Sequence, residues 1–266
     1  MNIGFLGIGN MGGAILKGFL ANGINSNNIF IYDIDTLKLN EYKKDFNVNI
    51  CLNYEQLLQN IDFLILAIKP NIFLEVLNDL KNYINSYKPT IISIAAGISI
   101  KDIKNIIDNN VGIVRIMPNI NAEICLSTSA YCYDNIKEEN LNIVTYLFEK
   151  IGSLFYIPEE KFSIFTAIAG CSPAYIYLFL DSIAKGAQKM GINKKEALQI
   201  AIDVTIGSAN MLKNSNKHSW ELIDSVCSPG GTTIEGICTL EENNFQQIIV
   251  KAIENTIKKD KLLNEK

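Results

Sequence analysis

Histidine and closely paired cysteines are scarce in this chain. One histidine and six cysteines occur in 266 residues, and no two cysteines have Cys-x-x-Cys spacing. A zinc site or other metal site built from such ligands is therefore not expected. We expect the cysteines to be reduced and mostly buried thiols, as in a cytoplasmic protein.

Long apolar runs and an excess of positive charge are also absent. The longest apolar runs, Phe63–Ile68 and Ile91–Ile98, have the length of strands and fall far below the roughly 20 residues that span a bilayer. The apolar N-terminus follows no basic segment and is interpreted as structure rather than as a signal peptide. The net charge is −4 and the 24 Lys and Arg residues are dispersed, which argues against nucleic-acid binding. We expect a cytoplasmic protein with neither nucleic-acid nor membrane partners.

The first half of the chain instead contains an alternation of short apolar runs and amphipathic stretches. Strands are predicted at residues 2–6, 29–32, 63–68, 91–95 and 112–116. Several are nearly continuous in Val, Ile, Leu and Ala, which is typical of strands buried on both faces of a parallel sheet. The alternation predicts a doubly wound α/β fold over residues 1–158. Its last elements are expected to be strands over 126–133 and 153–157 with a helix over 138–150 between them.

The pattern changes after Pro158. Apolar residues at helical spacing predict helices over Pro173–Met190 and Lys194–Leu212, with two more nearer the C-terminus. Strand signals are almost absent there. We therefore expect an all-α domain over residues 159–266.

A glycine-rich motif near the N-terminus predicts a dinucleotide site. Gly7-Ile8-Gly9-Asn10-Met11-Gly12 directly follows a strand and opens a helix, the context that a G-x-G-x-x-G motif requires. The first glycine permits a tight turn, the second lets N–H groups approach a pyrophosphate, and the third allows close helix–strand packing. The helix N-terminus adds partial positive charge. The motif predicts a Rossmann-like domain that binds NADH or NADPH, and a glycine-rich turn without a ligand is the alternative.

Asp33 bears on the choice between the two cofactors. It ends the second predicted strand, about 20 residues past the glycine motif, where an acid bonds the ribose 2′-OH and repels a 2′-phosphate. No arginine is nearby, although Lys38 is within reach. The residue favours NADH over NADPH, and the alternative is that Asp33 only caps the following helix.

Further motifs follow along the chain in a fixed order. They are Ala67-Ile68-Lys69-Pro70, Ser93-Ile94-Ala95-Ala96-Gly97-Ile98, Arg115-Ile116-Met117-Pro118-Asn119, Thr166-Ala167-Ile168-Ala169-Gly170-Cys171-Ser172-Pro173-Ala174-Tyr175 and Val226-Cys227-Ser228-Pro229-Gly230-Gly231-Thr232-Thr233-Ile234. With these motifs the chain resembles the pyrroline-5-carboxylate reductases over essentially its whole length. It departs from the family's usual residues at Asn121, Cys171 and Ser172.

The resemblance implies reduction of 1-pyrroline-5-carboxylate to L-proline, the last step of proline biosynthesis, by hydride transfer from NADH or NADPH. It also implies that the helical domain binds the substrate and forms a homodimer, with larger rings of dimers as in the family. Beyond the glycine motif, the cofactor residues that it implies are Asn53, Ala67, Ile68, Lys69, Pro70, Ile94, Ala95 and Ala96.

The last motif has a physical rationale as a carboxylate site. Hydroxyls of Ser228, Thr232 and Thr233 surround a turn that exposes the N–H groups of Gly230 and Gly231 ahead of a helix start. Such a combination binds anions, and each hydrogen bond to a charged group contributes roughly 1.5–3 kcal/mol. A capped helix start without a ligand is the alternative. We expect this cradle to face the pyrophosphate cradle across a cleft.

Thr233 is the candidate catalytic residue. An imine can be protonated before hydride arrives, so no strong acid such as histidine is obligatory. We assign the Thr233 hydroxyl to orient the imine nitrogen or to relay its proton. The single histidine, His218, is predicted to be a solvated loop residue, and Arg115 is predicted to form an ion pair or to position a loop.

Two alternative functions remain open. A β-hydroxyacid dehydrogenase shares the order of sheet then helices, but that family's second motif carries a lysine shortly after its glycines, which the stretch after Gly170 lacks. A cofactor-binding regulator without turnover would be favoured by the departures at Asn121, Cys171 and Ser172. The intact segment Ser228–Thr233 argues against it.

Overall fold

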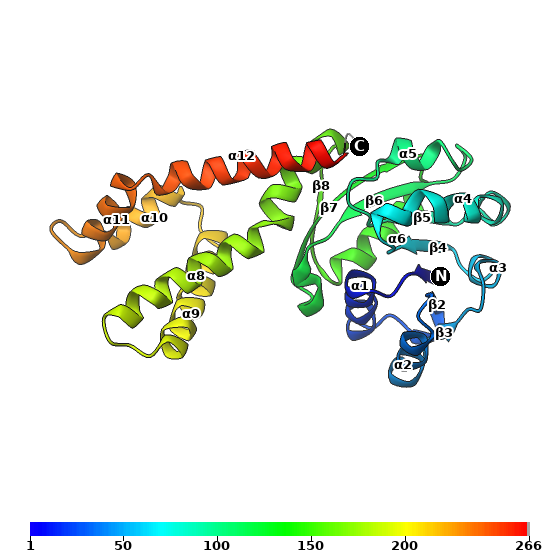
Figure 1. Ribbon diagram of the computed structural model, residues 1–266, viewed down its shortest axis with the longest axis horizontal. Coiled ribbons are helices and arrows are strands. Elements are labelled where there is room, and N and C mark those ends of the chain that lie inside the picture. Colours follow the sequence, from blue (N-terminus) through cyan, green and yellow to red (C-terminus); the bar gives the residue numbers. More distant parts are fainter. Residues whose placement is uncertain (265–266) are drawn as a thin grey trace. The chain divides into compact units, whose positions relative to one another are not determined.

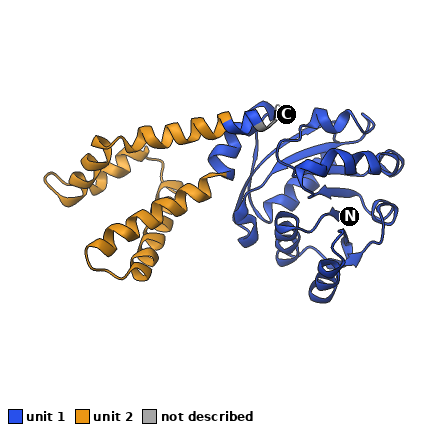
Figure 2. Cartoon of the chain, viewed as in Figure 1, with its two compact units in different colours: residues 1–170, 259–266 blue, residues 171–258 orange. Residues whose placement is uncertain are grey.

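The chain forms two compact units. The computed structural model describes residues 1–264. The sheet unit comprises Met1–Gly170 together with residues 259–264, and the helical unit comprises Cys171–Lys258 (Figure 2). The sequence predicts a boundary near Pro158, but the stretch that follows it groups with the sheet unit. The reason is packing, because Phe162, Phe165 and Ala169 belong to that unit's hydrophobic core.

The sheet unit contains an eight-stranded sheet in the order β3-β2-β1-β4-β5-β6-β7-β8 (Figure 1). The strands are β1 (Ile3–Leu6), β2 (Ile29–Tyr32), β3 (Asn49–Ile50), β4 (Phe63–Leu66), β5 (Thr90–Ser93), β6 (Ile113–Met117), β7 (Ser127–Asp134) and β8 (Gly152–Tyr156). All neighbours pair in parallel except β6 and β7, which are antiparallel. The predicted doubly wound fold is confirmed, and the reversal at β7 is an addition that hydrophobic runs alone do not reveal.

Helices cover both faces of this sheet. They are α1 (Asn10–Ala21), α2 (Thr36–Phe46), α3 (Tyr54–Leu58), α4 (Pro70–Tyr87), α5 (Ile100–Lys104), α6 (Glu138–Glu149) and the short α7 (Phe162–Phe165). Alternate residues of a strand point to opposite faces of the sheet. In β4, Phe63 and Ile65 pack on the face covered by α1, α2 and α6. Leu64 and Leu66 pack on the other face, which α3, α4, α5 and α7 cover. Because both faces of these strands are buried, their sequences are continuous runs of apolar residues.

The helical unit contains α8 (Ser172–Lys189), α9 (Lys194–Lys213), α10 (Ser219–Val226), α11 (Thr232–Glu242) and most of α12 (Phe245–Asn264). Helices α8 and α9 pack against each other, and Asp181 of α8 binds both Lys185 and Lys194 at 2.7 Å. Hydrogen bonds from these two ammonium groups lower the pKa of Asp181 to about 2.

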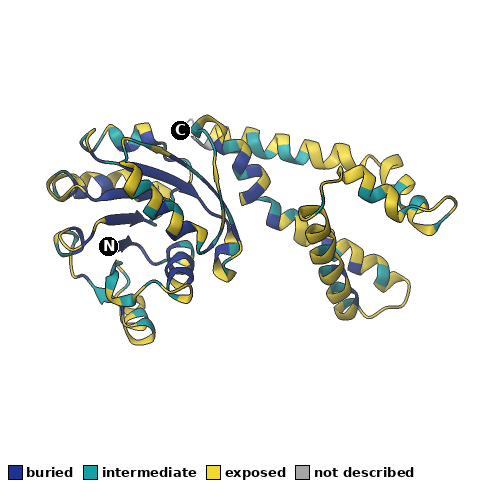
Figure 3. Cartoon of the chain, turned by 180° about the vertical axis from the view of Figure 1, so that it is seen from behind, coloured by how far each residue is buried: buried dark blue, intermediate teal, exposed yellow. Residues whose placement is uncertain are grey.

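Most of the helical unit's surface is uncovered in the single chain. Figure 3 shows buried residues concentrated in the sheet and its helices, whereas residues 171–258 are largely exposed. The exposed residues include large apolar side chains such as Tyr177, Leu178 and Val204, each at least 60% exposed. The helical stretch Glu159–Lys189 is long and apolar enough to cross a membrane by length and composition alone, and only 28% of its most apolar window is buried. Exposed apolar surface of this extent is typical of a face that packs against another protein or a membrane.

The six cysteines are free thiols. Cys51 and Cys132 are buried, Cys238 is exposed and the others are half-buried, so the expectation of mostly buried thiols is met only in part. Burial raises the pKa of Cys51 to about 11. Burial, reinforced by the negative charge of Glu159, raises the pKa of Cys132 to about 12. Both buried thiols are therefore protonated and unreactive at neutral pH.

Candidate active site

The glycine motif forms a tight turn between β1 and α1. Gly7 has φ +93°, and a Cβ there would lie 2.7 Å from the carbonyl oxygen of Ala67. A Cβ at Gly12 would lie 2.5 Å from the carbonyl oxygen of Gly7. Gly9 precedes α1, and no side chain caps the N–H groups of that helix. The turn therefore presents unpaired N–H groups at a helix N-terminus, an arrangement that binds phosphates.

Asp33 is fixed beside this turn. One carboxylate oxygen accepts a 2.8 Å hydrogen bond from the N–H of Ile8, and the other accepts a 2.9 Å bond from the N–H of Asp35. The cap of α2 is Asp35, whose side chain accepts from the N–H groups of Leu37 and Lys38. The alternative in which Asp33 caps the helix is therefore wrong. Its carboxylate joins the loop after β2 to the glycine turn.

The loops after β4 and β5 lie at the same edge of the sheet as the glycine turn. The N–H of Ala67 donates to the carbonyl of Leu6, and the N–H of Ile94 donates to the carbonyl of Leu66. Lys69 precedes α4 and Pro70 occupies its first turn, where proline needs no N–H partner. The structure thus brings together the glycine motif, Asp33, the segment 67–70 and the segment 94–96. These residues lie at the carboxyl ends of parallel strands, on both sides of the point where the strand order reverses.

Asn53 has a local structural role. It caps α3, since its side-chain oxygen accepts a 2.8 Å hydrogen bond from the N–H of Gln56. The residue follows β3, the strand at the end of the sheet. Its assignment to the adenosine end of the cofactor remains a prediction.

A cavity of about 430 Å³ opens beside the glycine turn. Its lining includes Gly9, Asn10, Lys17, Lys38 and Tyr42. Lys38 was expected near the cofactor from the sequence, whereas Lys17 was not. Lys17 lies on α1 at the i+7 position from Asn10 and hence on the same face. That spacing was the available signal. Glu41 and Glu123 line the same cavity, and Lys38 pairs with Asp35 at 3.9 Å, so the cavity carries charges of both signs.

The second predicted cradle lies in the helical unit at the start of α11. Gly230 has φ +68°, and the N–H of Gly231 donates a 2.9 Å hydrogen bond to the carbonyl of Ser228. The expectation that the turn exposes the N–H of Gly231 is therefore wrong, because the turn itself uses that donor. A Cβ at Gly231 would lie 2.4 Å from the Ser228 hydroxyl oxygen and 3.0 Å from the Ser228 carbonyl oxygen, so a side chain there would displace the Ser228 hydroxyl. No side chain caps α11, and within residues 1–264 the hydroxyls of Ser228, Thr232 and Thr233 have no hydrogen-bond partner. Exposed hydroxyls and uncapped N–H groups therefore gather at one helix start, as an anion site requires.

Other polar residues of the helical unit serve its structure. Exposed His218 caps α10, where its Nδ1 accepts from the N–H of Trp220 at 3.3 Å. The Tyr175 hydroxyl lies 2.5 Å from the Thr256 hydroxyl, which joins α8 to α12.

A Rossmann-type turn at the carboxyl edge of a largely parallel sheet, followed by a helical unit, is the arrangement of a nicotinamide-dependent oxidoreductase. Residues 159–263 match a family described as pyrroline-5-carboxylate reductase dimerisation, and residues 2–97 match one described as NADP oxidoreductase coenzyme F420-dependent. The chain is 37% identical to the pyrroline-5-carboxylate reductase of Aquifex aeolicus over 99% of this chain and 97% of that protein. The chain belongs to the pyrroline-5-carboxylate reductase family.

Solved structures agree with this assignment. A pyrroline-5-carboxylate reductase from Streptococcus pyogenes has a TM-score of 0.87 and 37% identity over 98% of both chains. The Plasmodium falciparum pyrroline carboxylate reductase, solved with NADP bound, has a TM-score of 0.88 and 31% identity over 99% of this chain and 98% of that one. The resemblance found in the sequence motifs is confirmed.

Proposed function

We propose that this protein reduces 1-pyrroline-5-carboxylate to L-proline with a reduced nicotinamide cofactor, in the cytoplasm. The observation that carries the proposal is the uncapped start of α11, where unpartnered hydroxyls and N–H groups form a cradle for a single carboxylate. A small cyclic imine offers little apolar surface, so its carboxylate must supply most of the binding energy. The free thiols fit a reducing compartment.

The glycine turn fits the cofactor's pyrophosphate. A Cβ at Gly9 would meet no atom within 4 Å, so open space lies beside the uncapped N–H groups. We assign Gly7–Gly12 to the pyrophosphate, Asp33 and Asn53 to the adenosine end, and residues 67–70 and 94–96 to the nicotinamide end. The cofactor supplies the hydride, and the protein's residues bind, orient and shield the reactants.

We assign the substrate to the second cradle. Ser228, Gly230 and Thr232 hold its carboxylate, Gly231 shapes the turn through its bond to the carbonyl of Ser228, and Thr233 also bonds the imine nitrogen as the catalytic residue. In this arrangement the hydroxyl orients the protonated imine for hydride attack or passes it a proton.

The direct test is to mix purified protein, NADH and 1-pyrroline-5-carboxylate and to follow the loss of NADH absorbance. We expect NADH to be oxidised only when the protein and the imine are both present. NADH binding without turnover would instead favour a regulator, and oxidation of 3-hydroxyacids would favour a β-hydroxyacid dehydrogenase.

Thr233→Ala is expected to lower kcat/KM for the imine ten-fold or more, a loss of at least about 1.4 kcal/mol. The reason is that the hydroxyl bonds the reacting nitrogen. Thr239→Ala is a matched control on the same helix, because the Thr239 hydroxyl donates to the carbonyl of Glu235 and faces no substrate in this assignment. Steady-state kinetics at saturating NADH measure both variants. Unchanged kinetics for Thr233→Ala would remove its catalytic role.

We further propose a preference for NADH over NADPH. The Asp33 carboxylate is held beside the glycine turn by the N–H groups of Ile8 and Asp35, so its charge lies where a ribose 2′-phosphate would approach. For the wild type we expect a higher kcat/KM with NADH than with NADPH. Asp33→Asn keeps an acceptor oxygen but loses the charge, so the ratio of kcat/KM for NADPH to that for NADH should rise at least ten-fold. Asp35→Asn is the control, since it removes a charge two positions away at the α2 cap. A wild-type preference for NADPH would contradict the proposal.

We also propose that the helical unit pairs with a second copy and that dimers assemble into larger rings. The family match over residues 159–263 contains the whole apolar stretch Glu159–Lys189. Association with another copy accounts for its exposed side chains without a membrane. Sedimentation that finds a stable monomer would contradict the dimer, and a single dimeric species would contradict the rings.

A further inference from the structure

The carbonyl of Ala169 lacks the partner that an α-helix would supply. Thr166–Gly170 forms a π-helical turn between α7 and α8. In an α-helix the carbonyl of Ala169 would accept from the N–H at position 173, and that residue is proline, which has no N–H. The N–H of Ala174 donates instead to the carbonyl of Cys171. A buried carbonyl without a donor costs stability, so another group must satisfy it.

The side chain of Asn119 supplies that group. Its Nδ2 donates a 3.0 Å hydrogen bond to the Ala169 carbonyl, and its Oδ1 accepts a 3.3 Å bond from the N–H of Thr128. A carbonyl on one side and an N–H on the other allow only one orientation of the amide. Asn119 is 5% exposed, and its own N–H donates to the Ser127 hydroxyl, which also lies 2.9 Å from the Ser129 hydroxyl. The amide is therefore held rigidly between β7 and the π-helical turn.

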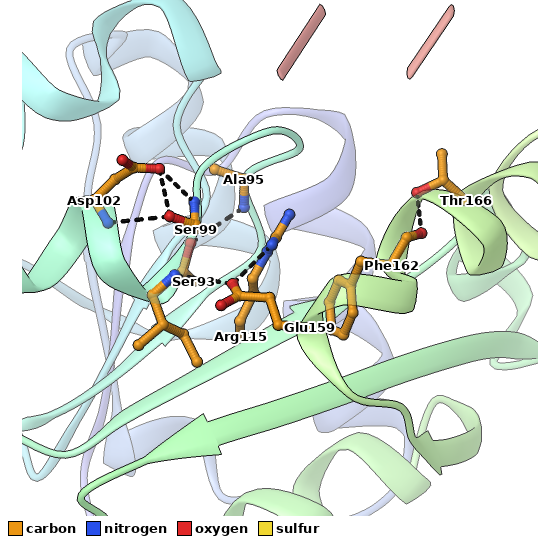
Figure 4. A network of polar contacts seen from close by, with 9 residues as sticks. Ser93, Ala95, Ser99, Asp102, Arg115, Glu159, Phe162 and Thr166 are labelled. Atoms are coloured by element: carbon orange, nitrogen blue, oxygen red, sulfur yellow. Dashed lines mark hydrogen bonds and ion pairs between the residues drawn. The ribbon is translucent and has the colours of Figure 1, made fainter. Parts of the chain in front are cut away.

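The same segment of chain fixes the other end of the connector, which we define as residues 159–170. Arg115 of β6 forms a 2.8 Å ion pair with Glu159, and its guanidinium lies 4.6 Å from the centre of the Phe162 ring (Figure 4). The same Glu159 oxygen accepts from the N–H of Ile100 at the start of α5. Arg115 thus forms the ion pair that its sequence position suggested. Arg115 and Asn119, at the two ends of one motif, anchor the two ends of the connector.

We propose that Asn119 is a positioning residue for hydride transfer. The connector leads from the unit that carries the glycine turn to the unit that carries the Ser228–Thr233 cradle. By supplying the donor that Pro173 lacks, Asn119 fixes the turn from which α8 departs. Reactants that must meet within about 3–3.5 Å lose rate steeply when their supports shift, whereas binding at either cradle is less sensitive. The inference rests on the proposed reductase activity, and it assigns no contact between Asn119 and the reactants.

The test compares Asn119→Ala and Asn119→Asp with wild type. Both are expected to lower kcat ten-fold or more at pH 8, while the Kd for NADH, measured by its fluorescence, stays within two-fold. The Asp variant should regain activity relative to wild type as the pH falls. Burial and the facing carbonyl raise the pKa of that carboxyl, and only its neutral form, present below that pKa, can donate to the Ala169 carbonyl. The Ala variant should show no such recovery.

Two controls separate positioning from general stability. Ser129→Ala removes a buried hydroxyl that bonds the Ser127 hydroxyl but makes no hydrogen bond to the connector. This variant should lower the melting temperature without changing kcat. Asn78→Asp removes another Asn-to-carbonyl hydrogen bond, from Asn78 to Leu74 on α4, and should leave kcat and its pH profile unchanged. Equal kcat in wild type and both Asn119 variants would overturn the inference, as would parallel loss of kcat and NADH binding. Because wild-type turnover is measured in the same series, failure of the proposed reaction would be recognised separately.

Discussion

Gly12→Ala is expected to lower kcat/KM for NADH at least 100-fold, a loss of about 2.7 kcal/mol of transition-state stabilisation. A Cβ at this position would lie 2.5 Å from the carbonyl oxygen of Gly7 and 2.8 Å from the Cβ of Ala67. Neither obstacle is a flexible side-chain end, so the backbone of the turn or of the loop after β4 must move. That movement displaces both the proposed pyrophosphate site and the proposed nicotinamide site, and misplacement by about 1 Å can cost 100-fold in rate.

Gly9→Ala provides the matched comparison for this effect. Its Cβ would meet no protein atom within 4 Å, so the fold and the melting temperature should not change. The methyl group would nevertheless occupy the open space at the start of α1 and weaken NADH binding. Thermal melts and NADH fluorescence titrations separate the two variants: Gly12→Ala should fail in both assays, and Gly9→Ala in binding alone. If Gly12→Ala binds NADH as wild type does, the turn is not the cofactor site.

The elements that the sequence predicts well are those with a strong local signal. Strands such as β4 and β5 are buried on both faces, so their apolar runs coincide with their positions in the sheet. The glycine turn was predictable because Gly7 needs a positive φ and because Gly12 touches backbone. Residues close together in sequence set both features, so no distant partner had to be known.

Features that depend on distant partners were missed. The connector lacks strand signals and lies within the family match over residues 159–263, but Phe162 and Phe165 pack in the core of the sheet unit, which only the structure reveals. The π-helical turn and its bond to Asn119 could not be derived locally, because the donor and the acceptor come from segments separated by the strands β7 and β8 and the helices α6 and α7. Pro173 was the one available clue, since it leaves a carbonyl that some other group must satisfy.

Glu159→Gln is expected to destabilise the protein by about 2–3 kcal/mol. The substitution keeps an oxygen that can accept from the N–H of Ile100 but removes the charge that faces Arg115. The Arg115 side chain is only 7% exposed and its Nε already lacks a partner, so little water can replace the lost carboxylate. The 30% exposure of Glu159 keeps the expected loss at the lower end for a broken buried pair.

The control variants make this second prediction specific to the ion pair. Glu160→Gln is the same chemical change at an exposed neighbour, so stability should stay within about 0.5 kcal/mol. Adding Arg115→Met to Glu159→Gln removes the uncompensated charge while an apolar chain of similar length fills its place over Phe162, and should recover at least half of the loss. Urea unfolding followed by far-UV circular dichroism measures all three. A Glu159→Gln variant as stable as Glu160→Gln would mean that the pair contributes nothing to holding the connector on the sheet.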